Sequence, residues 1–284
     1  MSSHNLSEIQ LGDLTVLGYS VAGEETVIAL PQLDVCFDVG KAPDQIIPIS
    51  HVLLTHGHMD HSAGFAYYLS QRKFCGMAPG TILAPANLIR TMEEILDSWG
   101  RLDGNRIPAN LVGVRPGDEY AIKPNLFARA FPTRHTAGSV GFTVLEKRKK
   151  LKTEYAGLTG PQIVELKKQG IAIDNPVEIP IVTYLGDTQY VDFSQLDYVV
   201  HSRILIAECT FYEDEHVGRA SAGRHMHVDE LAGLLGRLDN EHVIISHLTA
   251  RTPMSEARKM LKKALPPATH EKVIILMDRK YRRP

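Results

Sequence analysis

Long apolar runs and closely spaced cysteines are both missing from this chain of 284 residues. No stretch approaches the roughly 18 consecutive apolar residues that a membrane span requires, so we expect no membrane segment. The N-terminus carries neither a basic flank nor an apolar stretch, which argues against a secretory signal. Cys36, Cys75 and Cys209 lie far apart, so they indicate a reducing compartment rather than a disulfide framework. We therefore expect a cytoplasmic protein.

Excess positive charge is likewise missing. The chain has 31 Lys and Arg against 33 Asp and Glu, a formal net charge of −2. The surface as a whole is therefore not suited to a polyanion, and contact with nucleic acid requires a local basic patch. With 44% hydrophobic and 23% charged residues, the chain is not expected to be disordered. The composition does hold 13 histidines, and their positions indicate the function.

Short β-type segments alternate with helical stretches along the chain. We expect strands at 26–30, 34–38, 51–55, 111–119, 126–131, 141–145, 179–185, 204–207, 243–246 and 273–277, and helices at 63–71, 87–102, 228–238 and 255–265. Hairpins mixed with crossovers favour two sheets with helices outside them, which is an α/β fold. A basic stretch, 146–152 followed by 158–170, interrupts two of the strands. It is either a solvated surface helix or an arm that contacts phosphates.

The sequence THGHMDH directly follows the buried strand expected at 51–55. It places His56, His58, Asp60 and His61 within six residues, and Gly57 permits the tight curvature that turns them inward. Unpaired polar groups in a core are costly, so packing alone does not explain such a cluster. Imidazole and carboxylate ligands suit zinc and, less selectively, manganese or iron. The cluster therefore predicts a metal site.

This cluster resembles the HxHxDH motif of the metallo-β-lactamase superfamily. The resemblance implies a four-layer αββα sandwich of two mixed sheets with outer helices. Three further candidates, His135, Asp187 and His247, stand at the exits of expected strands, in the order of the family's remaining ligands. The resemblance implies two Zn²⁺ per subunit, with Mn²⁺ as an alternative metal. The implied ligands are His56, His58 and His135 for one ion, Asp60, His61 and His247 for the other, and Asp187 between them.

Three further segments narrow the family. They are AECTF at 207–211, GRHMH at 223–227 and HLTAR at 247–251, and HTAGSVGF at 135–142 accompanies them. From Leu14 to Arg251 the chain is similar to ribonuclease Z in its short, plant-like form. The resemblance implies a zinc-dependent endoribonuclease that cuts precursor tRNA 3′ of the discriminator base and removes the 3′ trailer. A hydroxide formed at the metals would attack the phosphodiester, with Asp60 orienting it.

The same resemblance assigns the remaining roles. His225, held by Glu208, would protonate the 3′ oxygen that leaves. Without that match, Glu208 reads as a buried salt-bridge partner and His225 as a contact at the start of the helix near Val228. Thr249 and Arg251 would hold the scissile phosphate. His227 replaces the small hydroxyl residue often found there, and its role stays open. A Gly-rich PxKxRN segment of many relatives is absent, and 17–23 reads LGYSVAG instead.

The basic stretch becomes a tRNA-binding arm under this resemblance, inserted at about 146–178 into a single domain spanning 1–284. Its phosphate contacts would come from Lys147, Arg148, Lys149, Lys150 and Lys152. In the family such an arm serves the active site of the partner subunit, so a homodimer is implied.

Two other functions compete with this one. A superfamily hydrolase of small phosphodiesters or thioesters would use the same metals without needing the arm. An RNA-binding protein that has lost catalysis would have no reason to keep seven metal ligands together with Glu208 and His225.

Overall fold

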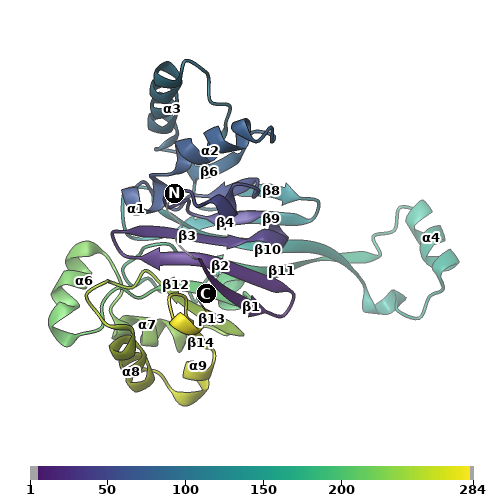
Figure 1. Ribbon diagram of the computed structural model, residues 1–284. Helices are drawn as coiled ribbons and strands as arrows, with labels where there is room; N and C mark the ends of the chain where they lie inside the picture. Colours follow the sequence, from purple (N-terminus) through teal and green to yellow (C-terminus); the bar gives the residue numbers. More distant parts are fainter. Residues whose placement is uncertain (1–5, 282–284) are drawn as a thin grey trace.

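Two seven-stranded sheets form the centre of the molecule in the computed structural model, which describes residues 6–281 (Figure 1). In spatial order, the first sheet contains β1 (Ser7–Leu11), β2 (Leu14–Val21), β3 (Glu25–Leu30), β4 (Val35–Phe37), β5 (His51–Leu53), β6 (Thr81–Pro85) and β7 (Asn110–Val114). The second contains β14 (Val273–Ile275), β13 (His242–Ser246), β12 (Ile204–Glu208), β11 (Asp174–Tyr184), β10 (Val140–Leu151), β9 (Leu126–Pro132) and β8 (Glu119–Lys123).

Each sheet has an antiparallel half and a parallel half. Strands β1 to β4 and β8 to β11 pair antiparallel, whereas β4 to β7 and β11 to β14 pair parallel. Parallel neighbours require crossover connections, and these carry most of the helices. The carboxyl ends of the parallel strands lie along one edge of each sheet, so the loops that follow them gather together.

Helices cover the outer face of both sheets. The helices of the described residues are α1 (Met59–Ser62), α2 (Phe65–Phe74), α3 (Ile89–Asp103), α4 (Gly160–Lys168), α5 (Asp197–Val200), α6 (Val217–Gly223), α7 (Val228–Leu235), α8 (Met254–Ala264) and α9 (Pro267–Glu271), of which α4 lies away from both sheets. In Figure 1, α2 and α3 lie on one side of the sheets and α7 and α8 on the other. None of the helices in the described part of the chain is both long and apolar enough to cross a bilayer.

Three layers of buried apolar side chains hold these elements together. Phe37 from the first sheet meets Phe142 and Tyr184 from the second in the layer between the sheets. A second layer joins α2 and α3 to the first sheet, and a third joins α7 and α8 to the second sheet. The order is therefore helix, sheet, sheet, helix, and the expected αββα sandwich of two mixed sheets is confirmed.

Two expected strands differ from those observed. The single strand expected at 111–119 is two strands in different sheets, β7 and β8. Gly117, with φ of 95°, turns the chain between them, and its N–H donates to the Ala130 carbonyl. The strand expected at 141–145 continues as β10 to Leu151, and β11 begins correspondingly early at Asp174. Strands β1, β2 and β6 were not expected from the sequence pattern.

The extended parts of β10 and β11 form a two-stranded ribbon that leaves the sandwich and ends at α4 (Figure 1). The register of the pair shifts at Val144/Leu145, and the side chains change from buried to exposed after Leu145. Helix α4 begins with a capping box between Thr159 and Gln162. The basic stretch is thus a projecting ribbon with a helix at its tip, and it falls within residues 146–178.

Candidate metal centre and active site

The candidate metal ligands and Glu208, the partner of the candidate acid His225, lie at the carboxyl edge of the two sheets. They stand at the end of, or just after, five different strands, β5, β9, β11, β12 and β13: His56, His58, Asp60, His61, His135, Asp187, Glu208 and His247. Because these loops converge at one edge, residues up to 191 positions apart in the sequence, from His56 to His247, become neighbours. In Figure 1 this edge carries α1 and α6, at the end of the sandwich away from α4.

One group of potential ligands contains His56, His58, His135 and Asp187. Their ligand atoms all lie within 4.8 Å of one another. His135 Nε2 is 3.0 Å from His58 Nδ1, and His56 Nε2 is 3.8 Å from Asp187 Oδ2. Burial lowers the pKa of His56 well below its usual value, with the neighbouring His61 adding to the effect, so this imidazole is neutral and keeps a free lone pair.

A second group contains Asp60, His61 and His247, again within 4.8 Å of one another. Asp187 Oδ2 lies between the groups, 3.2 Å from His61 Nε2 and 3.1 Å from His247 Nε2. Burial would raise the pKa of Asp187, but the adjacent His247 and His61 rings hold it well below its usual range. A carboxylate shared by both groups is the arrangement expected of Asp187.

These residues fit a pair of divalent cations. Four ligand atoms are buried without a hydrogen-bond partner in the described part of the chain: His56 Nε2, His61 Nε2, His247 Nε2 and Asp187 Oδ1. Buried polar atoms are normally satisfied, and leaving one unpaired costs about 1–3 kcal/mol. Four such atoms at one place, all nitrogen or carboxylate oxygen, are accounted for by cation binding.

Asp38 supports the centre and was not among the candidates from the sequence. This buried carboxylate accepts hydrogen bonds from the Thr55 N–H at 2.8 Å, the His61 Nδ1 at 2.7 Å and the Tyr184 hydroxyl at 3.0 Å. Because His61 uses Nδ1 for Asp38, its Nε2 faces Asp187. A signal was present in the sequence, since Asp38 is a charged residue that directly follows the apolar segment Val35–Phe37.

Glu208 and His225 form the acid pair expected from the sequence. His225 Nδ1 is 3.0 and 3.1 Å from the two carboxylate oxygens of fully buried Glu208. The Thr188 N–H donates to the same carboxylate at 2.6 Å. Burial alone would lower the pKa of His225, but the charge and hydrogen bond of Glu208 outweigh it and raise the pKa to about 9. His225 is therefore protonated at neutral pH.

The alternative reading of His225 as a contact at the start of α7 is wrong, because His227 does this. The His227 side chain accepts from the Asp229 N–H at 3.4 Å, and its own N–H donates to Glu230 at 3.0 Å. The residue whose role was open is thus a buried helix cap.

Thr210 connects the acid pair to the metal ligands and was also not predicted. Its hydroxyl donates to Glu208 Oε2 at 2.7 Å and lies 3.0 Å from His247 Nδ1. One hydroxyl proton serves one acceptor, so His247 Nδ1 carries the proton of the second bond. This leaves His247 Nε2 as the nitrogen that faces Asp60 and Asp187.

The remaining predicted residues occupy two places. Thr249 and exposed Arg251 follow His247, on a loop held to β2 by the Ala22 N–H and the Leu248 carbonyl at 3.0 Å. The Gly23 N–H of the same turn donates to Asp60 at 2.8 Å. The five basic residues lie on or just beyond the extended part of β10, away from the metal ligands: Lys147, Arg148, Lys149, Lys150 and Lys152.

The five basic side chains differ in whether they are already engaged in ion pairs within the chain. Lys147 forms an ion pair with Glu119 at 2.5 Å and lies over the Phe127 ring. Arg148 pairs with Glu146 at 2.6 Å. Lys149 and Lys150 are exposed.

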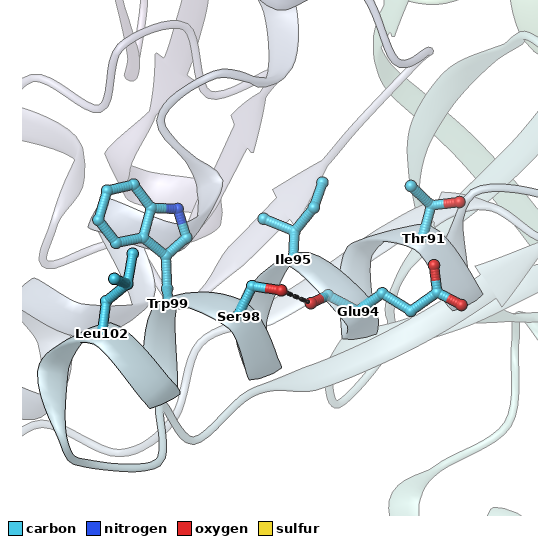
Figure 2. A pocket seen from close by; sticks show the side chains of 6 residues that line it. All are labelled: Thr91, Glu94, Ile95, Ser98, Trp99 and Leu102. Atoms are coloured by element: carbon cyan, nitrogen blue, oxygen red, sulfur yellow. Dashed lines mark hydrogen bonds between the residues drawn. The ribbon is translucent and has the colours of Figure 1, made fainter.

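A shallow pocket on α3 lies apart from this centre (Figure 2). Its lining is mostly one face of the helix: Thr91, Glu94, Ile95, Ser98, Trp99 and Leu102. Trp99 is 53% exposed and Leu102 78% exposed, which is unusual for side chains of this size. Glu94 is the one titratable side chain in this lining, and the group of acids, bases and metal ligands found at the other site is not repeated here, so we describe the pocket as a surface rather than an active site.

Fold and site together define a metal-dependent hydrolase of the β-lactamase superfamily. The family model described as "Beta-lactamase superfamily domain" matches residues 31–248. The chain is 33% identical to "tRNase Z TRZ1" of Arabidopsis thaliana over 94% of this chain and 96% of that protein. It is 27% identical to "tRNase Z TRZ2, chloroplastic" of the same plant, over 91% and 74%. The chain belongs to the tRNase Z family, and it is a metal-dependent endoribonuclease, a hydrolase.

Solved structures agree on the fold. The short form of human tRNase Z superposes with a TM-score of 0.55 at 16% identity, covering 93% of this chain and 88% of that one. The metallo-β-lactamase fold protein YhfI of Bacillus subtilis gives 0.64 at 15% identity, covering 92% and 94%.

Proposed function

We propose that this protein is a zinc-dependent endoribonuclease that cuts precursor tRNA 3′ of the discriminator base and so removes the 3′ trailer. The relatives named tRNase Z support tRNA 3′ processing as the activity. The observation that carries the proposal is the Glu208–His225 pair beside two groups of potential metal ligands. A phosphodiester hydrolase needs a proton donor for its leaving oxygen at this place, and His225 is a histidine held in the protonated form.

Two zinc ions would be held by His56, His58 and His135 on one side, Asp60, His61 and His247 on the other, and Asp187 between them. When bound, they would supply Lewis acidity for a phosphoryl oxygen and lower the pKa of water at the site. The Gly23 N–H fixes Asp60, whose carboxylate is placed to accept a proton from the attacking water. Manganese fits the same nitrogen and oxygen donors.

His225 acts on the side of the phosphorus opposite the attacking water, where the O3′ oxygen leaves. As the bond between phosphorus and O3′ breaks, the Nε2 proton of His225 passes to O3′, so the tRNA ends in a 3′-hydroxyl and the trailer keeps the phosphate. The Nδ1–H of His225 goes on donating to the Glu208 carboxylate, and this hydrogen bond fixes the orientation of the ring. Thr249 and Arg251 lie on the loop after His247 and bind the scissile phosphate, since a guanidinium pairs with two phosphate oxygens.

The projecting ribbon binds the body of the tRNA through phosphate contacts, led by exposed Lys149 and Lys150. It leaves the sandwich at the end away from α1 and α6, so it does not lie beside the metal ligands of its own subunit (Figure 1). That direction supports a homodimer in which each arm serves the partner's site. The exposed Trp99 and Leu102 on α3 offer an apolar surface for the subunit contact (Figure 2). The cytoplasmic location stays a prediction.

The test is cleavage of an end-labelled precursor tRNA by zinc-loaded protein, beside a small chromogenic phosphodiester. We expect one cut, at the discriminator base, with kcat/KM for the tRNA exceeding that for the small substrate by orders of magnitude. Folded, metal-replete protein that cleaves only the small substrate would instead identify the competing small-phosphodiester hydrolase.

A further inference from the structure

Arg224 immediately precedes the proton donor His225 and has an unusual backbone conformation. It caps the C-terminus of α6 with φ of 55° and ψ of 48°, in the left-handed region. Glycine adopts this conformation without strain, whereas an arginine Cβ crowds the following carbonyl. An arginine kept where glycine fits better indicates that its side chain has a use.

Arg224 is bound on both sides to the metal ligand His135. Its carbonyl oxygen is 3.2 Å from His135 Nδ1, and since a carbonyl only accepts, Nδ1 carries the proton. Its Nη1 donates to the His135 carbonyl at 2.8 Å. The guanidinium is therefore anchored to the backbone of the metal ligand His135, whose ring lies 4.7 Å from the ring of the proton donor His225.

Most of the hydrogen-bonding capacity of this guanidinium is still available. The Arg224 side chain is exposed, and its one hydrogen bond uses a single donor out of five. Within residues 6–281 no carboxylate forms an ion pair with it, in contrast to Arg129, Arg237 and Arg258, which are paired with acidic side chains. An anchored cation with free, coplanar donors at the rim of a site is suited to a phosphate group.

We propose that Arg224 is a substrate-binding residue that grips a backbone phosphate of the RNA strand beside the scissile bond. This inference rests on the proposed function, because it takes the substrate to be RNA. The backbone carbonyl of Arg224 keeps His135 in the tautomer whose Nε2 carries no proton. The guanidinium of the side chain provides a cationic contact for the RNA phosphate on a chain whose net charge is −2.

The test separates the role of the Arg224 carbonyl, which binds His135, from the role of the guanidinium, which binds phosphate. Arg224→Gly retains the carbonyl and relieves the left-handed strain, and Arg224→Asn does the same with a residue tolerated in this conformation. Both remove the guanidinium. We expect each variant to raise KM for precursor tRNA about tenfold. We also expect the slope of log KM against log salt to become shallower by about one.

Three readouts should stay at wild-type values in both variants: the zinc content, kcat for the tRNA, and kcat/KM for a small chromogenic phosphodiester. Arg224→Lys keeps the positive charge but cannot donate two parallel hydrogen bonds to one phosphate. Its KM for precursor tRNA should therefore lie between the wild-type value and that of the glycine and asparagine variants. Lys259→Gln, which removes an exposed charge from α8, is the matched control and should leave KM and the salt slope unchanged.

Two results would overturn the assignment. A wild-type KM and salt slope in the glycine and asparagine variants would show that the guanidinium contacts no phosphate. Loss of zinc together with equal loss of activity on both substrates would make Arg224 a support for His135 only. Wild-type protein that neither binds nor cuts precursor tRNA would be a different outcome, because it removes the proposed function and this inference with it.

Discussion

Replacing Glu208 by glutamine should move the basic limb of the pH–rate profile to lower pH. The glutamine keeps the size of the side chain and can still accept from the Thr188 N–H, but it removes the negative charge beside His225. That charge and its hydrogen bond overcome burial and raise the pKa of His225 from 6.5 to about 9. The shift of about 2.5 units corresponds to roughly 3 kcal/mol in favour of the protonated ring.

The sign of the effect follows from the role of His225 as an acid. Activity needs the protonated ring, so it is present below the pKa of His225 and is lost as the pH rises through it. In Glu208→Gln, burial acts unopposed by Glu208, and the limb should move below the ordinary value of about 6.5. At pH 8 the variant should be about a hundredfold slower than wild type, whereas near pH 5.5 the ratio should shrink to a few-fold.

The assay is the single-turnover rate on precursor tRNA from pH 5.5 to 9.5, with zinc content measured in each sample. Bound cations lower the pKa in both proteins alike, so the separation between the two limbs, at least two pH units, is the tested quantity. Glu230→Gln is the control, because Glu230 caps α7 three residues beyond His227 without touching His225. Coincident limbs in wild type and Glu208→Gln would refute the assignment of His225 as an acid tuned by Glu208.

Three further predictions address the surroundings of the site. Asp38→Asn should weaken zinc binding about 10- to 100-fold, because it removes the charge that holds His61; isothermal titration of metal-free protein measures this, and unchanged affinity would contradict it. The double change Lys149→Ala and Lys150→Ala should raise KM for precursor tRNA and flatten its salt dependence while kcat for a small phosphodiester stays constant; equal losses on both substrates would argue against a tRNA-binding arm. Trp99→Asp should convert a dimer into monomers in sedimentation velocity, and a mass unchanged by the substitution would exclude α3 as the contact.

Four of the candidate metal ligands could be predicted from a local signal, because they fall within six residues. The other three, His135, Asp187 and His247, came from the family resemblance together with their places at strand exits, and the structure brings all seven together. Asp38 and Thr210 could not be assigned in this way. Their roles depend on contacts with residues 23 and 37 positions away, His61 and His247, and such contacts exist only after the sheets have formed.

The fold was predictable to a similar degree. The pattern of strands and helices predicted two sheets with helices outside them, the family resemblance supplied the four-layer αββα order, and the structure has that order. The prediction of one strand at 111–119 was wrong because two short strands of different sheets follow each other in the sequence here, with a turn at Gly117 between them. The length of the arm was hidden for another reason: beyond Leu145 the β10 side chains face solvent, so no alternation of buried and exposed residues marks the strand.

The most direct test of the account is to map the product ends of precursor tRNA cut by zinc-loaded wild type and by His225→Ala. The account predicts a single cut by wild type at the discriminator base, with a 3′-hydroxyl on the tRNA and a 5′-phosphate on the trailer. It predicts that His225→Ala binds the same tRNA and zinc but cleaves at least a hundredfold more slowly. A wild-type rate in His225→Ala, or a 3′-phosphate on the tRNA product, would contradict it.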